Sequence, residues 1–312
     1  MILAGIDIGT LTCRLLIALV EDNGHLVELR SDRRVLRLGE GLDQGKRLLV
    51  PAMQRVIGTL REWREVIDTH QVDGEIVVAT SAVRNAVNRD EFLAKVKQEM
   101  GLAVEVISGE EEARRTMLGI RSGLPADVTA ILGLDIGGGS TEFILDRPGR
   151  PPVVRSVELG VVRLTERCLA HDPPTVQELV EARSLVKRSA QTVRTALDDL
   201  AGVTFVGTAG TITTLAAMAQ KLPVYVGSRI HNYRLSLEDT RRLEAEVLAC
   251  TKAQRTKLLG LELGREDVIV AGTIILREVM EVMGFAVCLV SDLGLREGIV
   301  LDLAARLRNR EA

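Results

Sequence analysis

The sequence predicts an α/β protein of two domains, and three observations support this. Its 312 residues exceed the length at which a single hydrophobic core usually keeps growing. The pattern Gly-x-Asp-Ile-Gly occurs at Gly5 and again at Gly133, 128 residues later. Strand-like runs alternate with helix-like runs in both halves, which is typical of sheets covered by helices. The turn-rich segment 121–127 predicts a boundary between a domain of residues 1–124 and one of residues 125–312, whose C-terminal helix can pack back on the first domain.

The first half opens with a predicted hairpin, because two short β-rich runs flank the turn DIGT. Val56, Leu60 and Trp63 recur at helical spacing, and Ser108 with Glu111 forms the S-x-x-E signal of a capping box. The predicted strands are 2–8, 14–20, 75–80 and 104–107, and the predicted helices are 52–70, 89–100 and one that begins after Ser108.

The second half repeats the alternation. Phe205 and Val206 lead into GTAGTITTLAAMAQ, a strand-turn-helix pattern, and Ser236 with Asp239 marks another helix start. The predicted strands are 129–136, 141–146, 153–157 and 286–290, and the predicted helices are 176–200, one running to Ala249, and one that closes the chain.

The composition indicates a soluble globular protein, with 46% hydrophobic and 27% charged residues. A net charge of −3 gives no overall attraction to nucleic acid, so no nucleic-acid partner is expected. The four cysteines are dispersed without C-x-x-C spacing, which argues against a zinc site or a disulfide framework. No charge-free run of about 20 apolar residues occurs, and Asp7 interrupts the first apolar run. We therefore expect a cytoplasmic protein without a membrane span, and a homodimer on base rates.

The segment GLDIGGGSTEFIL combines a glycine turn with two acids. A strand that ends at Asp135 and turns through glycines presents several backbone N–H groups at one concavity, which suits anions. The carboxylates of Asp135 and Glu142 bracket the turn and suit Mg²⁺. An isolated turn of this kind is often an ordinary hairpin bend, but its repetition around Asp7 predicts two phosphate clamps that face a cleft. The candidate residues of the second copy are Asp135, Gly137, Gly138, Gly139, Ser140, Thr141 and Glu142.

Three acids, Glu110, Glu111 and Glu112, stand at a predicted helix start. The helix dipole and the capping position account for Glu110 and Glu111. Glu112 lies beyond the capping position on another face, where it could act as a general base. Arginines near the motif turns could bind phosphate or be ordinary surface charges. They are Arg14, Arg84, Arg114, Arg115 and Arg163.

The common nucleotide-binding loops are missing from the sequence. The pattern G-x-x-x-x-G-K-[ST] does not occur, and GLDQGKR at 41–47 fails its spacing and its last residue. The segment GGGSTE does not satisfy G-x-G-x-x-G, because position 142 is a glutamate.

The sequence resembles the exopolyphosphatase and guanosine pentaphosphate phosphohydrolase (Ppx/GppA) family, within the actin-like superfamily that includes sugar kinases and chaperone ATPases. The matching blocks run in order through nearly the whole chain. They are DIGTLTCRLLI, VATSAVRNAVN, VISGEEEAR, GLDIGGGSTEFIL, VELGVVRLTE, GTAGTITTLA, DVIVAGTIILREVM and VSDLGLREGIVLD.

The resemblance implies two actin-like (ribonuclease H-like, ASKHA superfamily) domains with an interdomain active-site cleft. It implies that Glu112 activates water and that Asp135 and Glu142 are associated with Mg²⁺ or another divalent cation. The phosphate-binding residues that it implies are Asp7, Thr10, Thr12, Arg14, Arg84, Gly137, Gly138, Gly139, Ser140 and Thr141.

Two features depart from the family pattern. The family's first turn commonly reads D-x-G-S-N-S, whereas this chain has Thr10, Leu11 and Thr12 there, so an apolar side chain replaces an amide. Many long relatives also carry a C-terminal HD-type helical region, and this chain resembles the short form without it. Short polyphosphate or a nucleotide pentaphosphate would suit the shorter chain.

Four functions follow as hypotheses. The first is Mg²⁺-dependent exopolyphosphatase activity, which releases orthophosphate from the end of inorganic polyphosphate. The second is hydrolysis of the 5′-terminal phosphate of guanosine pentaphosphate (pppGpp). An actin-like kinase and a non-catalytic binder of polyphosphate or alarmone are more distant alternatives.

Overall fold

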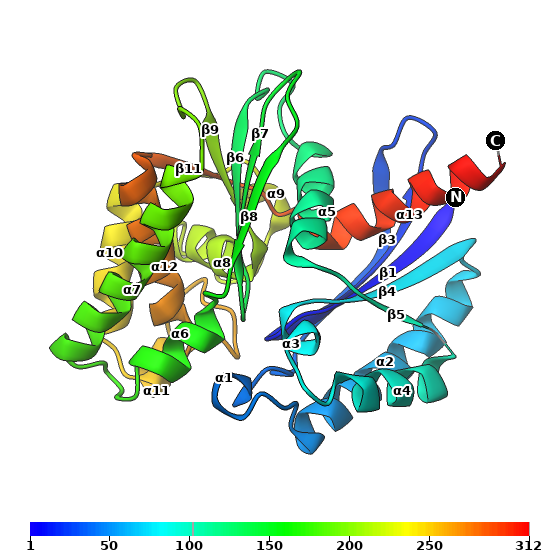
Figure 1. Cartoon of the computed structure of the whole chain (residues 1–312), viewed down its shortest axis with the longest axis horizontal. Helices are drawn as coiled ribbons and strands as arrows, with labels where there is room; N and C mark the ends of the chain where they lie inside the picture. Colours follow the sequence, from blue (N-terminus) through cyan, green and yellow to red (C-terminus); the bar gives the residue numbers. More distant parts are fainter. Residues whose placement is uncertain (102, 312) are drawn as a thin grey trace. The chain divides into compact units, whose positions relative to one another are not determined.

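The computed structural model describes residues 1–101 and 103–311, which form two compact units (Figure 1). Unit 1 comprises Met1–Gly123 and Leu293–Ala312, and unit 2 comprises Leu124–Asp292. The predicted boundary between residues 124 and 125 lies next to the first junction, and the C-terminal helix belongs to unit 1. Each unit contains one mixed sheet with helices packed on it, so the predicted α/β fold class is confirmed.

Unit 1 contains a five-stranded sheet of order β3-β2-β1-β4-β5. Strands β1, β2 and β3 form an antiparallel meander, and β4 and β5 continue the sheet in parallel with β1. The strands are β1 Ile2–Ile8, β2 Thr12–Val20, β3 Leu26–Val35, β4 Gly74–Ala79 and β5 Val104–Val106. The helices are α1 Leu42–Gly45, α2 Val50–His70, α3 Ser81–Arg84, α4 Arg89–Met100, α5 Gly109–Arg121 and α13 Leu295–Glu311.

Both faces of this sheet are buried, each by its own apolar cluster. Successive side chains of a strand point to opposite faces and so contribute to the two clusters in turn. Ile6 and Leu15 pack on one face with Trp63 of α2. Leu3 packs on the other face with Ile299 of α13. Helix α13 lies beside α5 on this second face (Figure 1). The two helices approach so closely that a side-chain carbon at Gly298 would collide with the backbone of α5, which explains a glycine within a helix.

Unit 2 contains a six-stranded sheet of order β10-β11-β9-β6-β7-β8. Strands β6, β7 and β8 form an antiparallel meander, and β9 and β11 run parallel to β6. The strands are β6 Ile131–Ile136, β7 Thr141–Asp146, β8 Val153–Val157, β9 Thr204–Thr208, β10 Arg234–Ser236 and β11 Val287–Val290. The helices are α6 Val161–Cys168, α7 Val176–Thr195, α8 Ala209–Ala219, α9 Gly227–Ile230, α10 Leu237–Leu248, α11 Lys252–Arg255 and α12 Ile269–Met283.

One predicted element needs correction, and one strand was not predicted. The helix expected at 176–200 ends at Thr195, where the N–H groups of Ala196 and Leu197 donate to the carbonyls of Val193 and Arg194 and tighten the last turn. Strand β3, Leu26–Val35, lies where no element was predicted from the sequence. Its charged, exposed residues fit an edge strand, where charge opposes pairing with another chain. Within residues 1–101 and 103–311, no helix is both long and apolar enough to cross a bilayer.

Candidate functional site

The first Gly-x-Asp-Ile-Gly copy forms the turn between β1 and β2. Asp7 lies directly opposite Arg14 in the antiparallel register, so both side chains point to the same face of the sheet. The Gly9 N–H donates to the Thr12 carbonyl at 3.1 Å and closes the turn. Arg14 is half-buried, and the described residues offer its guanidinium no hydrogen bond or ion pair. This leaves Arg14 able to bind an anion.

The second copy forms the turn between β6 and β7 with the same register. Asp135 lies directly opposite Glu142, and the Gly137 N–H donates to the Ser140 carbonyl at 3.0 Å. The two turns therefore match residue by residue across the 128-residue repeat. Among the differences between the two turns, the one that matters most for chemistry is the charge of the side chain opposite the aspartate, which is Arg14 in one and Glu142 in the other.

Helix α6 fixes the orientation of the glycine turn in unit 2. The carbonyl groups of residues 137–139 accept hydrogen bonds from Val161 N–H at 3.0 Å, Val162 N–H at 2.9 Å and Arg163 Nε at 3.0 Å. In a planar trans peptide the C=O and the next N–H point in opposite directions. The N–H groups of residues 138–140 consequently point away from α6, and none of them has an acceptor in the described part of the chain. Three such groups in a row form an anion-binding nest.

The turn in unit 1 is oriented in the same way by a different segment. The Thr10 carbonyl accepts the Gly39 N–H at 2.9 Å, and the Leu11 carbonyl accepts those of Leu36 and Arg37 at 2.9 Å. The N–H groups of Thr10 and Leu11 have no acceptor among residues 1–101 and 103–311. Leu11 itself is buried, so its apolar side chain packs inside while its backbone N–H provides the polar contact.

The two acids of unit 2 form a pair that suits a cation. Asp135 and Glu142 are 7% and 0% exposed, and each faces the other across the β6–β7 ladder. Like charges directly opposite each other destabilise a sheet, and a divalent cation that prefers oxygen ligands would offset that cost. The described residues contain no group of three or more His, Cys, Asp or Glu side chains that could hold a metal ion. A Mg²⁺ ion here would therefore keep water or phosphate oxygens as its other ligands.

Neighbouring strands extend this pair into a polar row. Ser156 of β8 lies opposite Glu142, and its hydroxyl donates to Glu142 Oε1 at 2.8 Å. Thr208 of β9 lies beside Asp135 in the parallel register and is buried. Neither Ser156 nor Thr208 was predicted from the sequence, because neither lies within GLDIGGGSTEFIL; the strand register places both beside the acidic pair.

Glu112 lies in the first turn of α5 and is 7% exposed. The Ser108 hydroxyl accepts the Glu111 N–H at 3.2 Å, so the predicted cap forms on the serine side. Arg84, expected to contact phosphate, donates through Nη1 to Glu112 Oε2 at 3.1 Å and to the Ile107 carbonyl at 2.8 Å. In this structure Arg84 therefore holds the acid, and any phosphate would have to compete for it.

The residues expected in unit 1 meet at one edge of its sheet. The carboxyl ends of β1, β4 and β5 lie side by side, since Thr80 N–H donates to the Ile8 carbonyl and Ile107 N–H donates to the Ala79 carbonyl. Asp7 is the penultimate residue of β1, Arg84 follows β4 and Glu112 follows β5. Open α/β sheets usually bind ligands beyond the carboxyl ends of their strands.

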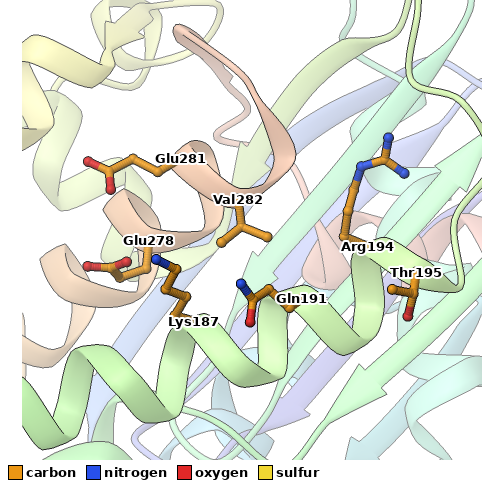
Figure 2. Close-up of a pocket in the computed structure, with 7 residues that line it drawn as sticks. All are labelled: Lys187, Gln191, Arg194, Thr195, Glu278, Glu281 and Val282. Atoms are coloured by element: carbon orange, nitrogen blue, oxygen red, sulfur yellow. The ribbon is translucent and has the colours of Figure 1, made fainter.

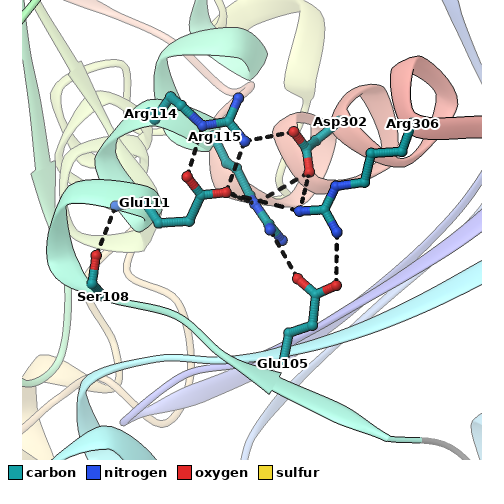
Figure 3. Close-up of polar contacts among 7 residues, drawn as sticks. All are labelled: Glu105, Ser108, Glu111, Arg114, Arg115, Asp302 and Arg306. Carbon is teal, nitrogen blue, oxygen red and sulfur yellow. Dashed lines mark hydrogen bonds and ion pairs between the residues drawn. The ribbon is translucent and has the colours of Figure 1, made fainter. Parts of the chain in front are cut away.

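Ion pairs hold α5 against β5 and α13 (Figure 3). Arg114 and Arg115 of α5 both bind Glu111, at 2.7 and 2.6 Å, and Arg114 also binds Asp302 of α13 at 2.5 Å. Arg115 and Arg306 both bind Glu105 at 2.8 Å. The Arg114 guanidinium, followed by Arg115, lowers the pKa of Glu111 to about 2. These ion pairs give Arg114 and Arg115 a structural role, and Arg115 is buried rather than an ordinary surface charge.

Two observations limit the candidate site. The Thr141 hydroxyl, expected to bind phosphate, donates to the Leu159 carbonyl and is fully buried. We therefore assign Thr141 to the structure of the turn. A cavity of about 470 Å³ lies between α7 and α12, lined by residues such as Lys187, Gln191 and Glu281 (Figure 2). None of the expected site residues lines this cavity, so it is separate from the candidate site.

Comparison with known proteins identifies the family. The Ppx/GppA phosphatase family matches residues 17–307. The chain belongs to this family. Exopolyphosphatase 2 of Mycobacterium tuberculosis is 39% identical over 96% of this chain and 98% of its own length. The crystal structure of an exopolyphosphatase-like protein is 35% identical, covers 98% of each chain and gives a TM-score of 0.92. Guanosine-5'-triphosphate,3'-diphosphate pyrophosphatase of Aeromonas hydrophila is 29% identical over 96% of this chain and 59% of its own length.

Proposed function

We propose that the protein is an exopolyphosphatase, which hydrolyses the terminal phosphoanhydride bond of inorganic polyphosphate and releases orthophosphate. One observation carries the proposal: Glu112 stands at the sheet edge where the β1–β2 turn presents N–H groups and Arg14, in a chain that aligns along its length with a relative named exopolyphosphatase. An acid beside anion-binding groups is what attack of water on a phosphate requires.

The chemistry assigns a role to each group. Glu112 accepts a proton from water as the water attacks the terminal phosphorus, and the shortened chain leaves. The N–H groups of Thr10 and Leu11, in the same unit as Glu112, donate to phosphate oxygens and stabilise the charge of the transition state. Residues 138–140 of unit 2 present a further set of N–H groups that suits phosphate oxygens. Arg14 binds a phosphate of the chain through its guanidinium fork. Arg84 orients the Glu112 carboxylate.

Asp135 and Glu142 would hold a Mg²⁺ ion, and the paired carboxylates fit such an ion for the reason given above. When bound, Mg²⁺ would supply charge neutralisation for phosphate oxygens. Ser156 holds one oxygen of Glu142 in place, so the carboxylate presents its other oxygen with a fixed geometry.

Hydrolysis of guanosine pentaphosphate is the second candidate, because a relative of that activity by name aligns with 96% of this chain. Both substrates end in a phosphoanhydride, so the same groups would serve either one. Homodimerisation and cytoplasmic location stay predictions, and light scattering on the purified protein tests the first.

The test is phosphate release by the purified protein with Mg²⁺ from short polyphosphate, long polyphosphate and guanosine pentaphosphate. Glu112→Gln should lower kcat at least about a hundredfold, as loss of a general base does. Glu110→Gln is the matched control, because Glu110 lies two residues away in the same helical turn but is exposed. Equal activity of Glu112→Gln and the wild type would remove Glu112 as the base. Phosphate release that requires an added acceptor would favour a kinase.

A further inference from the structure

We propose that Arg163 is a positioning residue: together with the first turn of α6, it orients the N–H groups of residues 138–140 toward the phosphate chain. The inference rests on the proposed function, because it assigns a phosphate as the ligand of that turn. Arg163 would act through the backbone and not by touching the substrate.

The turn between β6 and β7 contains three consecutive glycines, residues 137–139. A run of three glycines has few steric limits on its backbone, so its peptide planes rotate easily unless something holds them. Each carbonyl of residues 137–139 is held by its own donor on α6. Two of these donors are backbone N–H groups, and the third is the Arg163 side chain. Without Arg163, the peptide between Gly139 and Ser140 would lose its only side-chain anchor in the described residues.

Contacts with Gly139 and Glu158 hold the Arg163 side chain in place. Its side chain is 8% exposed, its Nε donates to the Gly139 carbonyl at 3.0 Å, and its Nη2 lies 2.5 Å from Glu158. The two contacts use different nitrogen atoms of one planar fork. A lysine has a single nitrogen and cannot reproduce this geometry. The charge of Arg163 is balanced by Glu158, so the residue contributes orientation and not a free positive charge.

Helix α6 begins directly against the glycine turn. A side-chain carbon at Gly160 would collide with the Gly138 carbonyl and the Gly139 nitrogen. Gly160 therefore permits α6 to begin directly against the turn, close enough for its first N–H groups to reach the turn carbonyls. The block ELGVVR at 158–163 thus supplies an ion-pair partner, the close approach and all three donors.

The experiment measures tripolyphosphate binding by calorimetry in a Glu112→Gln background, in which turnover is expected to be at least about a hundredfold slower. Arg163→Met should weaken binding about tenfold or more, as small displacements of binding groups do. Mn²⁺ binding, followed by electron paramagnetic resonance as a probe of the cation site, should stay unchanged. Added methylguanidinium should restore part of the lost affinity. Arg155→Met is the matched control, because the exposed Arg155 also donates to a backbone carbonyl, that of Val154.

A second pair of variants tests the backbone contacts and does not depend on Arg163. Val161→Pro removes the N–H that binds the Gly137 carbonyl, and proline is tolerated at the first helical position. Val161→Ala keeps that N–H and removes only side-chain packing. The proline variant should bind tripolyphosphate more weakly than the alanine variant.

The outcomes separate the inference from the proposed function. If Arg163→Met and Val161→Pro bind tripolyphosphate like their controls, the inference fails even when the wild type hydrolyses polyphosphate. Equal losses of tripolyphosphate and Mn²⁺ binding would also overturn it, because they indicate general distortion. If both variants weaken tripolyphosphate binding but the wild type hydrolyses none of the substrates, the inference stands and the proposed function fails. Absence of tripolyphosphate binding in the parent protein overturns the inference.

Discussion

In unit 1, Asp7 lies opposite Arg14 across the β1–β2 turn, whereas in unit 2 Asp135 lies opposite Glu142 across the β6–β7 turn. The register, the closing hydrogen bond and the outward N–H groups are alike, but the pair in unit 1 has no net formal charge and the pair in unit 2 has two negative charges. By our proposal, one backbone plan suits an anion in one unit and both a cation and an anion in the other. The repeat is one of backbone shape, and the side chain opposite the aspartate sets the difference in charge.

The largest effect is expected from a variant that breaks the acidic pair of unit 2. Glu142→Gln should reduce Mn²⁺ affinity at least about a hundredfold, because loss of a carboxylate ligand should exceed the 10- to 100-fold cost of losing a second-shell group. Arg14→Gln should leave Mn²⁺ affinity unchanged and raise the KM for polyphosphate. Titration of both variants with Mn²⁺ by electron paramagnetic resonance gives the comparison. Similar losses of Mn²⁺ affinity in both variants would show that the two turns do not differ as described.

A smaller effect is expected when the hydroxyl group that binds Glu142 is removed. Ser156→Ala removes the hydroxyl that binds Glu142 and should weaken Mn²⁺ binding about tenfold. Ser156→Thr should restore most of the affinity. Ser31→Ala is the matched control, because the Ser31 hydroxyl also donates to a glutamate, Glu28, on the exposed strand β3. An unchanged affinity in Ser156→Ala would mean that the ladder alone positions Glu142.

The smallest effect concerns stability. It is expected from Glu111, whose role is structural, whereas its neighbour Glu112 has a proposed catalytic role. Because Arg114 and Arg115 lower the pKa of folded Glu111 to about 2, its contribution is present above its unfolded pKa of roughly 4.3 and is lost as the pH falls toward 2. Glu111→Gln should lower the free energy of unfolding by about 1 kcal/mol or less at pH 7, since the pair is partly solvent-exposed. The difference from the wild type in urea unfolding should shrink between about pH 4.5 and pH 2. A constant difference across that range would contradict the assignment.

The sequence was informative where local pattern and local structure coincide. The hairpin around Asp7, the hairpin around Asp135 and the cap at Ser108 follow from turn residues and spacing, and the structure has all three. Strand β3 escaped prediction because its charges hide the β pattern at a sheet edge.

Contacts that depend on register or on distant segments could not be predicted. The bond from Ser156 to Glu142 joins residues 14 positions apart, and the Arg84 contact with Glu112 joins residues 28 apart. Thr141 stands next to Glu142 in sequence, but strand alternation turns its hydroxyl to the opposite face. A motif therefore indicates which segment carries the chemistry, and the sheet decides which of its side chains do.

Helix α13 follows unit 2 in the chain but completes the core of unit 1, where Ile299 packs with Leu3. A ribosome that adds about 5–20 residues per second needs roughly 10–30 s to make Leu124–Asp292 before α13 emerges. During that interval the face of the β1–β2–β4 sheet that α13 later covers lacks its partner helix and exposes apolar side chains. The order of synthesis therefore leaves apolar surface of the nascent first unit uncovered until α13 emerges, while the second unit can fold without waiting.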